Sequence, residues 1–412
     1  MKIVHICTSL EGGAGLCAAR IIRSTRAQGI DAKALVPQGV KSEFVDVVQP
    51  QDPLSKFWLI RRVQMYLRKK GFWPKPELIS KRIFLECIKN GKQVTFTSPV
   101  TFYKNITSHP WLKEADIIHL HWIGDFVDYK SFFGSIDKPV VWTIHDQNPG
   151  LGGFHYQVWK DNATDSFKAF DDELVLLKKR AYKKVQSMTL VAISTMMRDF
   201  CQSNVLLRDF PCTLIHNGIE ESCFIPISKE CVRKSLDLSA ESTVFLFVAQ
   251  DIHNNIKGLN ELIQALELLH LPNVVLVCIG RYCQFPTSSF EVRCEGFISN
   301  DRLLSSYYSA ADYFVMPSYQ EGFAQVPMEA MACGTPVVAF PCSGAHDLIN
   351  QENGVVCEDF TVDALVKGIS LAMSRNYDRQ QIREDVVRRF SYNVIGQQYV
   401  DLYRRILAGQ KG

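Results

Sequence analysis

Two glutamates, Glu321 and Glu329, flank the start of an expected helix and could bind the hydroxyl groups of a nucleotide or a sugar. The run 313–316 reads as a buried strand, and residues 317–325 form the loop beyond its carboxyl end. Pro327 fits the first helical position, where its missing N–H costs nothing. Ligands of open α/β sheets bind at that edge, and free N–H groups at a helix start can hold a phosphate. One carboxylate could therefore bind a ribose and the other a sugar. The ordinary alternative is that Glu329 complements the helix dipole and Glu321 faces solvent.

A cation is available in the same half of the chain. Lys257 follows the apolar run 244–249 and precedes Gly258 at the expected start of a helix. A lysine there could stabilise negative charge on a departing diphosphate; the alternative is an ordinary surface lysine. The chain has no Asp-x-Asp pair that would hold a divalent metal on a diphosphate. The sequence therefore predicts a site without a metal.

His145 ends the expected strand 140–144, where a histidine could face a ligand. Asp146 and His155 are weaker candidates in the following segment. A histidine at a strand end is more often structural, and His119 and His121 are interpreted in that way.

Short apolar runs alternate with longer helical patterns, which is typical of strands joined by crossover helices in a parallel sheet. The expected strands are 3–8, 32–36, 117–121, 140–144, 189–194, 213–216, 244–249, 274–279, 313–316 and 336–339. The helices expected in the second half are 258–269, 301–310 and 328–333. A glycine loop at 12–15 should precede a helix at about 16–28. A chain of 412 residues suits two domains, and the rhythm restarts after Asn217, so the boundary should lie near 210–225. The last pattern, 390–407, predicts an amphipathic helix.

Charge and targeting signals restrict the partners and the location. The formal net charge is +3, so no global field favours nucleic acid. The first residues do not form a signal peptide, and no run of about 20 apolar residues could span a membrane. The 13 cysteines form no C-x-x-C pair, which predicts reduced thiols rather than a metal ribbon. A cytoplasmic protein is expected.

The segment 56–92 departs from the average composition. It holds eleven Lys or Arg residues against two Glu, with aromatic residues between them. A basic, aromatic, amphipathic segment suits an anionic membrane surface, which would place the protein on the inner face of the membrane. The alternative is a solvated helix pair whose aromatic side chains pack on the domain.

The eighteen residues from Glu321 to Val338 resemble the E-x7-E signature of the family 4 glycosyltransferases, which have the GT-B fold. The resemblance implies two Rossmann-like, doubly wound α/β domains that face each other across a cleft, with a C-terminal helix that returns to the first domain. The implied parts are 1–213 on the acceptor side, 214–389 for the nucleotide-sugar donor and 390–412 for the returning helix.

The same resemblance assigns the donor site. It implies that Glu321 contacts the donor sugar and that Glu329 binds the ribose. Gly322, Phe323 and Ala324 complete the donor-binding loop, the last two through backbone amides. Residues 245–250 and 255–259 look like the family's donor-phosphate segment, in which Lys257 neutralises the diphosphate. Where the family often has an arginine, this chain has Gln250 and Ile256, so the contact with the phosphates is either weaker or completed by Arg281.

The first half is similar to one branch of this family, the polysaccharide and colanic-acid type, through residues 142–146 and 152–156. His145 matches the histidine that faces the donor sugar. Gly13 and Ala14 stand where the family places its first glycine loop, close to the phosphates or the acceptor. Asn217 resembles part of the turn at the domain junction and is given a structural role.

The resemblance implies a retaining transfer from a nucleotide-diphosphate sugar to a hydroxyl of a glycan or lipid-linked glycan, in surface polysaccharide biosynthesis. No carboxylate nucleophile follows from the motifs. The implied path is a same-face displacement in which the departing phosphate helps to deprotonate the acceptor. No metal and no cofactor are expected, because the nucleotide sugar is a co-substrate.

Three other functions fit the sequence less well. Residues 13–18 satisfy the G-x-G-x-x-A fingerprint of dinucleotide-binding proteins, but the acidic residue expected after the second strand is missing, which argues against a dehydrogenase. A GT-B nucleotide-sugar epimerase would carry different motifs at Glu321. A catalytically silent binding module would have no reason to keep Lys257, Glu321, Glu329 and His145 together.

Overall fold

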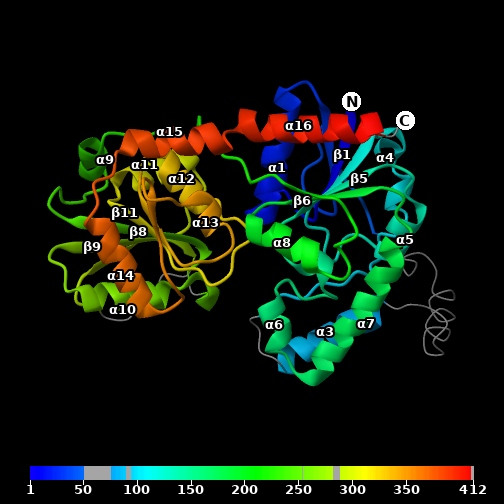
Figure 1. The fold of residues 1–412 in the computed structure, drawn as a ribbon, viewed down its shortest axis with the longest axis horizontal. Helices are drawn as coiled ribbons and strands as arrows, with labels where there is room; N and C mark the ends of the chain where they lie inside the picture. The colour runs from blue at the N-terminus through cyan, green and yellow to red at the C-terminus, as the bar shows by residue number, and fades with distance from the viewer. Residues whose placement is uncertain (51–75, 90–93, 253, 282–287, 410–412) are drawn as a thin grey trace. The chain divides into compact units, whose positions relative to one another are not determined.

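The computed structural model describes residues 1–50, 76–89, 94–252, 254–281 and 288–409. The chain divides into two compact units, each described by itself (Figure 1). Unit 1 comprises Met1–Ile215 and Gly396–Gly412, and unit 2 comprises His216–Ile395.

Unit 1 is built on a seven-stranded sheet in the order β3-β2-β1-β4-β5-β6-β7, with every neighbouring pair parallel. Its strands are apolar along almost their whole length because helices cover both faces. The strands are β1 Lys2–Ile6, β2 Asp31–Val36, β3 Val45–Val47, β4 Ile117–Leu120, β5 Val140–Ile144, β6 Met188–Ala192 and β7 Cys212–Leu214. The helices are α1 Gly12–Ala27, α3 Pro76–Lys89, α4 Pro110–Glu114, α5 Tyr129–Ser135, α6 Gln157–Asp161, α7 Asp165–Tyr182 and α8 Thr195–Ser203. Two 3-10 turns, η1 Ile106–Ser108 and η2 Asn148–Gly150, complete the unit.

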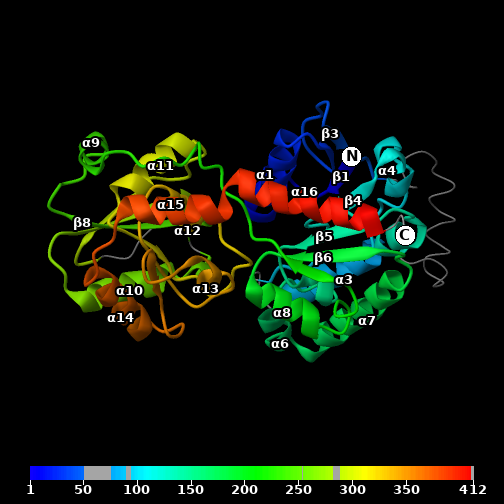
Figure 2. The same ribbon diagram turned by 45° about the horizontal axis from the view of Figure 1, so that its top comes forward.

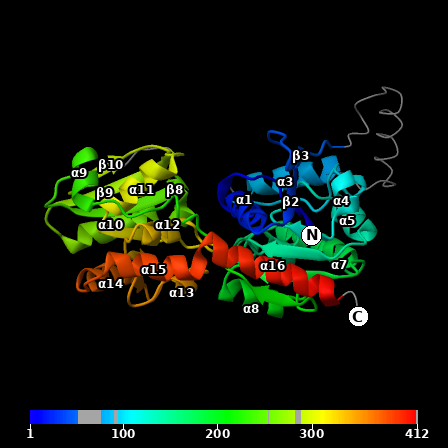
Figure 3. The ribbon, with the colours of Figure 1, turned by 90° about the horizontal axis from the view of Figure 1, so that it is seen from above.

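Unit 2 repeats the pattern with six parallel strands in the order β10-β9-β8-β11-β12-β13. They are β8 Thr243–Asp251, β9 Val274–Arg281, β10 Glu291–Cys294, β11 Tyr313–Met316, β12 Val337–Ala339 and β13 Gly354–Val356. The helices are α9 Lys229–Ser235, α10 Leu259–Leu269, α11 Asp301–Ala310, α12 Val326–Ala332, α13 Ala345–Leu348, α14 Val362–Met373 and α15 Arg379–Phe390, with the 3-10 turn η3 at Asn255–Lys257. Helices α10 and α14 lie side by side (Figure 2), and α15 lies beside α12 (Figure 3).

The last helix, α16 (Tyr392–Gly409), gives its first turn to unit 2 and the rest of its length to unit 1. In unit 1 its Tyr399 and Tyr403 are fully buried. Gly396 allows the helix to pack closely, because a Cβ there would lie 2.5 Å from the side-chain nitrogen of Gln28. The prediction that the final helix returns to the first domain is confirmed.

The structure differs from the sequence-based prediction at two helix starts and at one cysteine, besides strands that were not predicted. Helix α1 begins at Gly12, so the expected glycine loop at 12–15 is already the first helical turn. Gly15 is required there because a Cβ would lie 2.6 Å from the carbonyl oxygen of Ser9. Helix α12 begins at Val326, one residue before Pro327. Among the described cysteines eleven carry free thiols, but Cys294 is disulfide-bonded, contrary to the expectation of reduced thiols throughout.

Most of the basic segment 56–92 lies outside the described residues, which include its helix α3. Ile79 and Ile83 pack on a cluster that includes Phe167 and Phe170 of α7, and Figure 1 shows the ribbons of α3 and α7 next to each other. Within the part of the chain that the structure describes, no helix is long and apolar enough to cross a bilayer.

Candidate functional site

Lys257 and Glu321 form an ion pair at the carboxyl end of the unit 2 sheet, with Lys257 Nζ 2.6 Å from Glu321 Oε1. Lys257 ends η3, which follows β8, and Glu321 lies in the loop after β11; these strands are neighbours. Gly258 closes the turn with φ of +73°, and a Cβ there would lie 2.0 Å from the carbonyl oxygen of Pro317. Both charged side chains keep some exposure, 29% for the lysine and 15% for the glutamate. The pair is therefore ordered but still open to a ligand.

Glu329 lies in the first turn of α12 and is almost completely buried, with 5% exposure. The phenolic hydroxyl of Tyr308, on α11, donates a hydrogen bond to its Oε2 at 3.0 Å. Tyr308 is itself held, since Thr335 Oγ1 donates to its backbone oxygen at 2.6 Å. A buried carboxylate oriented in this way can accept hydrogen bonds from a diol at low entropic cost.

Residues on the buried side of the loop between the two glutamates hold that loop in place. Phe323 is buried between the rings of His216 and Phe390, at centroid distances of 5.1 and 5.8 Å. Asn217 Nδ2 donates to the carbonyl oxygen of Phe323 at 3.0 Å. The junction residue Asn217 thus has the structural role predicted for it, by holding this loop.

The exposed side of the loop remains available. Ser343 Oγ donates to the carbonyl oxygen of Gly322 at 2.9 Å, so that oxygen is directed inward. Ala324, like Gly322, is partly exposed. Two carbonyl oxygens of the loop, those of Gly322 and Phe323, are therefore used to anchor it.

His145 lies in unit 1, directly after β5, and 9% of it is exposed. Its Nε2 lies 3.2 Å from Nδ1 of His121, and Nε2 of His121 lies 2.9 Å from Nδ1 of His5. Burial lowers the pKa of His145 to about 4, so the ring is neutral at physiological pH. A neutral imidazole can orient a polar group but carries no charge to a phosphate.

His119 belongs to a second polar network. Its Nδ1 contacts the hydroxyl of Tyr403 at 2.7 Å, and its Nε2 contacts Thr143 Oγ1 at 2.8 Å. Thr143 in turn meets the hydroxyl of Tyr399 at 3.0 Å. This network attaches α16 to β4 and β5, and the structural interpretation of His119 agrees with it.

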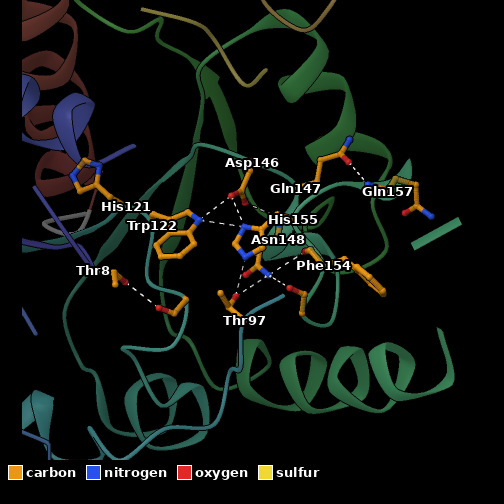
Figure 4. Close-up of polar contacts among 12 residues, drawn as sticks. Thr8, Thr97, His121, Trp122, Asp146, Gln147, Asn148, Phe154, His155 and Gln157 are labelled. Carbon is orange, nitrogen blue, oxygen red and sulfur yellow. Dashed lines mark hydrogen bonds and ion pairs between the residues drawn. The ribbon is translucent and has the colours of Figure 1, made fainter. Parts of the chain in front are cut away.

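Asp146 and His155 form a buried pair in the segment that follows β5 (Figure 4). His155 Nδ1 lies 2.6 Å from Asp146 Oδ2, and the indole N–H of Trp122 donates to the same oxygen at 2.9 Å. Burial opposes ionisation of Asp146, but His155 and the hydrogen bonds hold its pKa below the ordinary value. Thr97 Oγ1 occupies the other nitrogen of His155 at 3.0 Å. The pair is therefore engaged in holding the segment.

Helix α7 carries two buried ionisable side chains that were not predicted from the sequence. Asp171 Oδ1 accepts from the backbone N–H groups of Gly153 and Phe154, at 2.6 and 3.2 Å. Lys178 donates to the carbonyl oxygen of Asn148 at 2.6 Å. Both fix the segment between β5 and α6. Their only sequence signal is a charge on the apolar face of an amphipathic helix.

The other predicted residues of unit 1 lie at the first turn of α1. Gly13 is exposed and Ala14 partly exposed, and a Cβ on Gly13 would meet no atom within 4 Å. The candidate residues thus form two groups. Lys257, Glu321, Gly322, Phe323, Ala324 and Glu329 lie around one sheet edge of unit 2, and His145, Gly13 and Ala14 lie in unit 1.

Comparison with known proteins adds a family and relatives. Residues 228–388 match the family model described as glycosyl transferases group 1. An uncharacterised glycosyltransferase of Methanocaldococcus jannaschii is 27% identical over 309 residues, which cover 70% of this chain and 75% of that protein. The N,N'-diacetylbacillosaminyl-diphospho-undecaprenol alpha-1,3-N-acetylgalactosaminyltransferase of Campylobacter jejuni is 26% identical over 272 residues, covering 63% of this chain and 69% of that protein.

A solved structure resembles the whole chain. HepE of Anabaena, in complex with UDP-glucose, superposes with a TM-score of 0.65 at 18% sequence identity, covering 98% of this chain and 100% of that one. At this level of identity the likeness establishes the fold.

Proposed function

We propose that this GT-B glycosyltransferase, with its group 1 match at residues 228–388, transfers a sugar from a nucleotide diphosphate to a hydroxyl of a glycan or lipid-linked glycan, with retention of anomeric configuration. A relative that acts on a diphospho-undecaprenol acceptor and a similar fold that binds UDP-glucose support this substrate pair. We further propose membership of family 4, in its colanic-acid and polysaccharide branch, and a role in surface polysaccharide biosynthesis.

The observation that carries the proposal is the Lys257–Glu321 pair beside the buried Glu329. Without a donor, Lys257 neutralises Glu321. When a diphosphate binds, its charge competes for the ammonium group, and Glu321 becomes free to accept hydrogen bonds from the sugar. Glu329, oriented by Tyr308, holds the ribose. Lys257 then stabilises the charge that develops as the diphosphate leaves.

The transfer itself requires positioning more than covalent catalysis. The acceptor hydroxyl attacks the face from which the diphosphate departs, the bond to the leaving oxygen breaks, and that oxygen takes the acceptor proton. His145 supplies a neutral hydrogen-bonding group to the donor sugar. The lack of an Asp-x-Asp pair motivates a transfer in which a lysine takes the place of a divalent cation.

The test separates the two glutamates. Glu329→Ala should weaken nucleoside diphosphate binding about ten- to hundredfold, since a hydrogen bond to a charged group contributes roughly 1.5–3 kcal/mol. Glu321→Ala should instead lower kcat more than diphosphate affinity, because the sugar becomes cationic only in the transition state. Calorimetric titration with the diphosphate and turnover with the sugar donor measure the two effects.

Exposed Asp301→Ala on α11 serves as a control and should change neither quantity. The site assignment fails if Glu321→Ala loses diphosphate affinity while Glu329→Ala keeps it. Wild-type protein that hydrolyses and transfers nothing from any donor would be a silent binding module. Turnover in excess EDTA should equal that without it; a loss that Mg²⁺ or Mn²⁺ restores would refute the metal-independent mechanism.

A further inference from the structure

A chain of three imidazoles connects the interior of unit 1 with His145. Nδ1 of His5 lies 2.9 Å from Nε2 of His121, and Nδ1 of His121 lies 3.2 Å from Nε2 of His145. His5 and His121 also stack, with ring centroids 5.2 Å apart. One hydrogen atom is therefore shared across each of the two gaps.

All three rings are neutral, so this row of imidazoles can hold its protons in only two ways. Burial lowers the pKa of His5 to about 3 and of His145 to about 4, and that of His121 falls well below its ordinary value. A neutral imidazole has one N–H donor and one lone pair. Hence either every ring is protonated at Nδ1, or every ring is protonated at Nε2.

His5, at the buried end of the row of imidazoles, distinguishes these two proton arrangements. Nε2 of His5 is buried and has no hydrogen-bond partner among the described residues. With Nε2 protonation throughout, that atom would be an unpaired N–H group in the core. With Nδ1 protonation throughout, it would be an unpaired acceptor, and buried unpaired acceptors are less rare than buried unpaired N–H groups.

We propose that His5 and His121 act as positioning residues that fix His145 as its Nδ1–H tautomer. The other end of the chain agrees with this, because Nδ1 of His145 is bonded to no described residue and is free to donate. His145 thus offers an N–H group, rather than a lone pair, to a hydroxyl oxygen. Its use toward the donor sugar rests on the proposed function; the tautomer itself does not.

A metal ion is the other occupant that this cluster suggests, because ligand atoms of His5, His119 and His121 lie within 4.8 Å of one another. Both nitrogens of His119 are already bonded to Thr143 and Tyr403. Both nitrogens of His121 are bonded to its neighbouring histidines. A metal would have to displace these bonds, so the structure assigns the nitrogens to hydrogen bonding.

The tautomer can be measured directly. In the full-length protein labelled with ¹⁵N-histidine, long-range ¹H–¹⁵N correlation spectra distinguish a protonated Nδ1 from a protonated Nε2, and His145→Gln assigns the resonances. At pH 7.5 we expect His145 to carry its proton on Nδ1. A protonated Nε2, or shifts averaged between the two forms, would overturn the proposal.

Position 5 supplies a second, independent test. His5→Glu places an acceptor beside Nε2 of His121, which should pull a proton onto that atom and move the proton of His145 to Nε2. His5→Gln can still donate to His121 and should leave His145 as in the wild type. If the His5→Glu variant folds but His145 keeps its proton on Nδ1, the proposed coupling along the three imidazoles is refuted. If the variant does not fold, the wild-type spectrum still decides which tautomer His145 adopts.

Activity provides a separate measurement. The glutamate variant should lower kcat/KM for the sugar donor about two- to tenfold, as expected for one lost hydrogen bond, and leave diphosphate affinity unchanged. A tautomer switch without a change in turnover would refute the role of His145 in the proposed function while supporting the coupling along the three imidazoles.

Discussion

Tyr308 holds the buried carboxylate of Glu329 in unit 2. Its hydroxyl donates to Glu329 from a fully buried position on α11. Tyr308→Phe should weaken nucleoside diphosphate binding about ten- to hundredfold, because a hydrogen bond to a charged group is lost while the ring still fills its space. Calorimetric titration would measure the change.

Tyr307→Phe, the same substitution at the preceding residue, is the matched control and should bind the diphosphate like the wild type. Equal affinity in the Tyr308→Phe variant and the wild type would show that Glu329 needs no such support, or that the ribose binds elsewhere.

At the residue scale, sequence reasoning could name charged residues but not their partners. Lys257 and Glu321 were identified separately from motif position, and their pairing became visible only when β8 and β11 were placed side by side. Tyr308 was missed because it lies 21 positions from Glu329 and looks like an ordinary apolar residue of an amphipathic helix. Contacts between residues so far apart in the chain leave no local pattern.

The turn between η3 and α10 is an element that the site requires. Gly258→Ala should lower the free energy of unfolding of unit 2 by more than the roughly 1–2 kcal/mol that a left-handed conformation costs, because a Cβ there would meet Pro317. It should also weaken diphosphate binding by displacing Lys257. Urea unfolding and calorimetric titration measure the two effects.

Gly296→Ala is the control, since Gly296 also has positive φ, +69°, but a Cβ would meet no atom within 4 Å. Its free energy of unfolding should fall only by the cost of the left-handed conformation, and it should bind the diphosphate like the wild type. Equal destabilisation by both substitutions would mean that the backbone at Pro317 moves to make room for the added methyl group.

Lys178, on helix α7, should make the free energy of unfolding depend on pH in the alkaline range. Burial lowers the pKa of Lys178 to about 7, from 10.5 in an exposed lysine. Between these values the unfolded chain binds more protons at this group than the folded chain, so its contribution to stability rises with pH, by up to about 1.4 kcal/mol per unit.

This contribution can be measured as a difference in slope. The free energy of unfolding, from urea titrations at pH 7.5, 8.5 and 9.5, should rise less steeply in Lys178→Met than in the wild type. The neighbouring exposed Lys179→Met should keep the wild-type slope. Parallel slopes in all three proteins would show that Lys178 stays protonated in the folded state.

At the scale of elements, apolar runs were predicted well, whereas three of the four edge strands were not. Strand β11 and helix α11 match their predicted bounds, because β11 is a continuous apolar run and α11 is an amphipathic helix with Asn300 as its N-cap. Strands β3, β10 and β13 were missed; they are three or four residues long and lie at or near the sheet edges. Their pairing is decided by the neighbouring strand rather than by their own pattern.

At the scale of the whole molecule, α3 bears on membrane association. Its outer side exposes Phe84, Leu85 and Ile88, which are 64%, 48% and 57% exposed, beside basic residues. We propose that this side contributes to binding an anionic membrane, together with the preceding basic residues. Phe84→Ser with Ile88→Ser should reduce binding to vesicles that contain phosphatidylglycerol several-fold, because apolar area no longer enters the interface.

Sedimentation with vesicles at low and high salt would measure this. The control is Val158→Ser with Leu176→Ser, which also removes exposed apolar side chains from unit 1 and should bind like the wild type. Wild-type binding to neutral vesicles as strong as to anionic ones would contradict the proposal.

The two-sheet architecture was predictable because the alternation of strands and helices restarts after Asn217, and each half fills its own core. The return of the last helix to the first unit was predicted as well, but from the family resemblance; its partners there, such as His119 and Thr143, became visible only in the structure.

That division of unit 1 has a consequence for synthesis on the ribosome. The 180 residues of His216–Ile395 must be translated before Gly396 appears, which takes roughly 9–36 s at about 5–20 residues per second. During this interval the nascent sheet lacks Tyr399 and Tyr403, and the imidazole of His119 lacks its hydroxyl partner on α16. A protein that binds nascent chains would find this polar face open, and it would be the last part of the first unit to close.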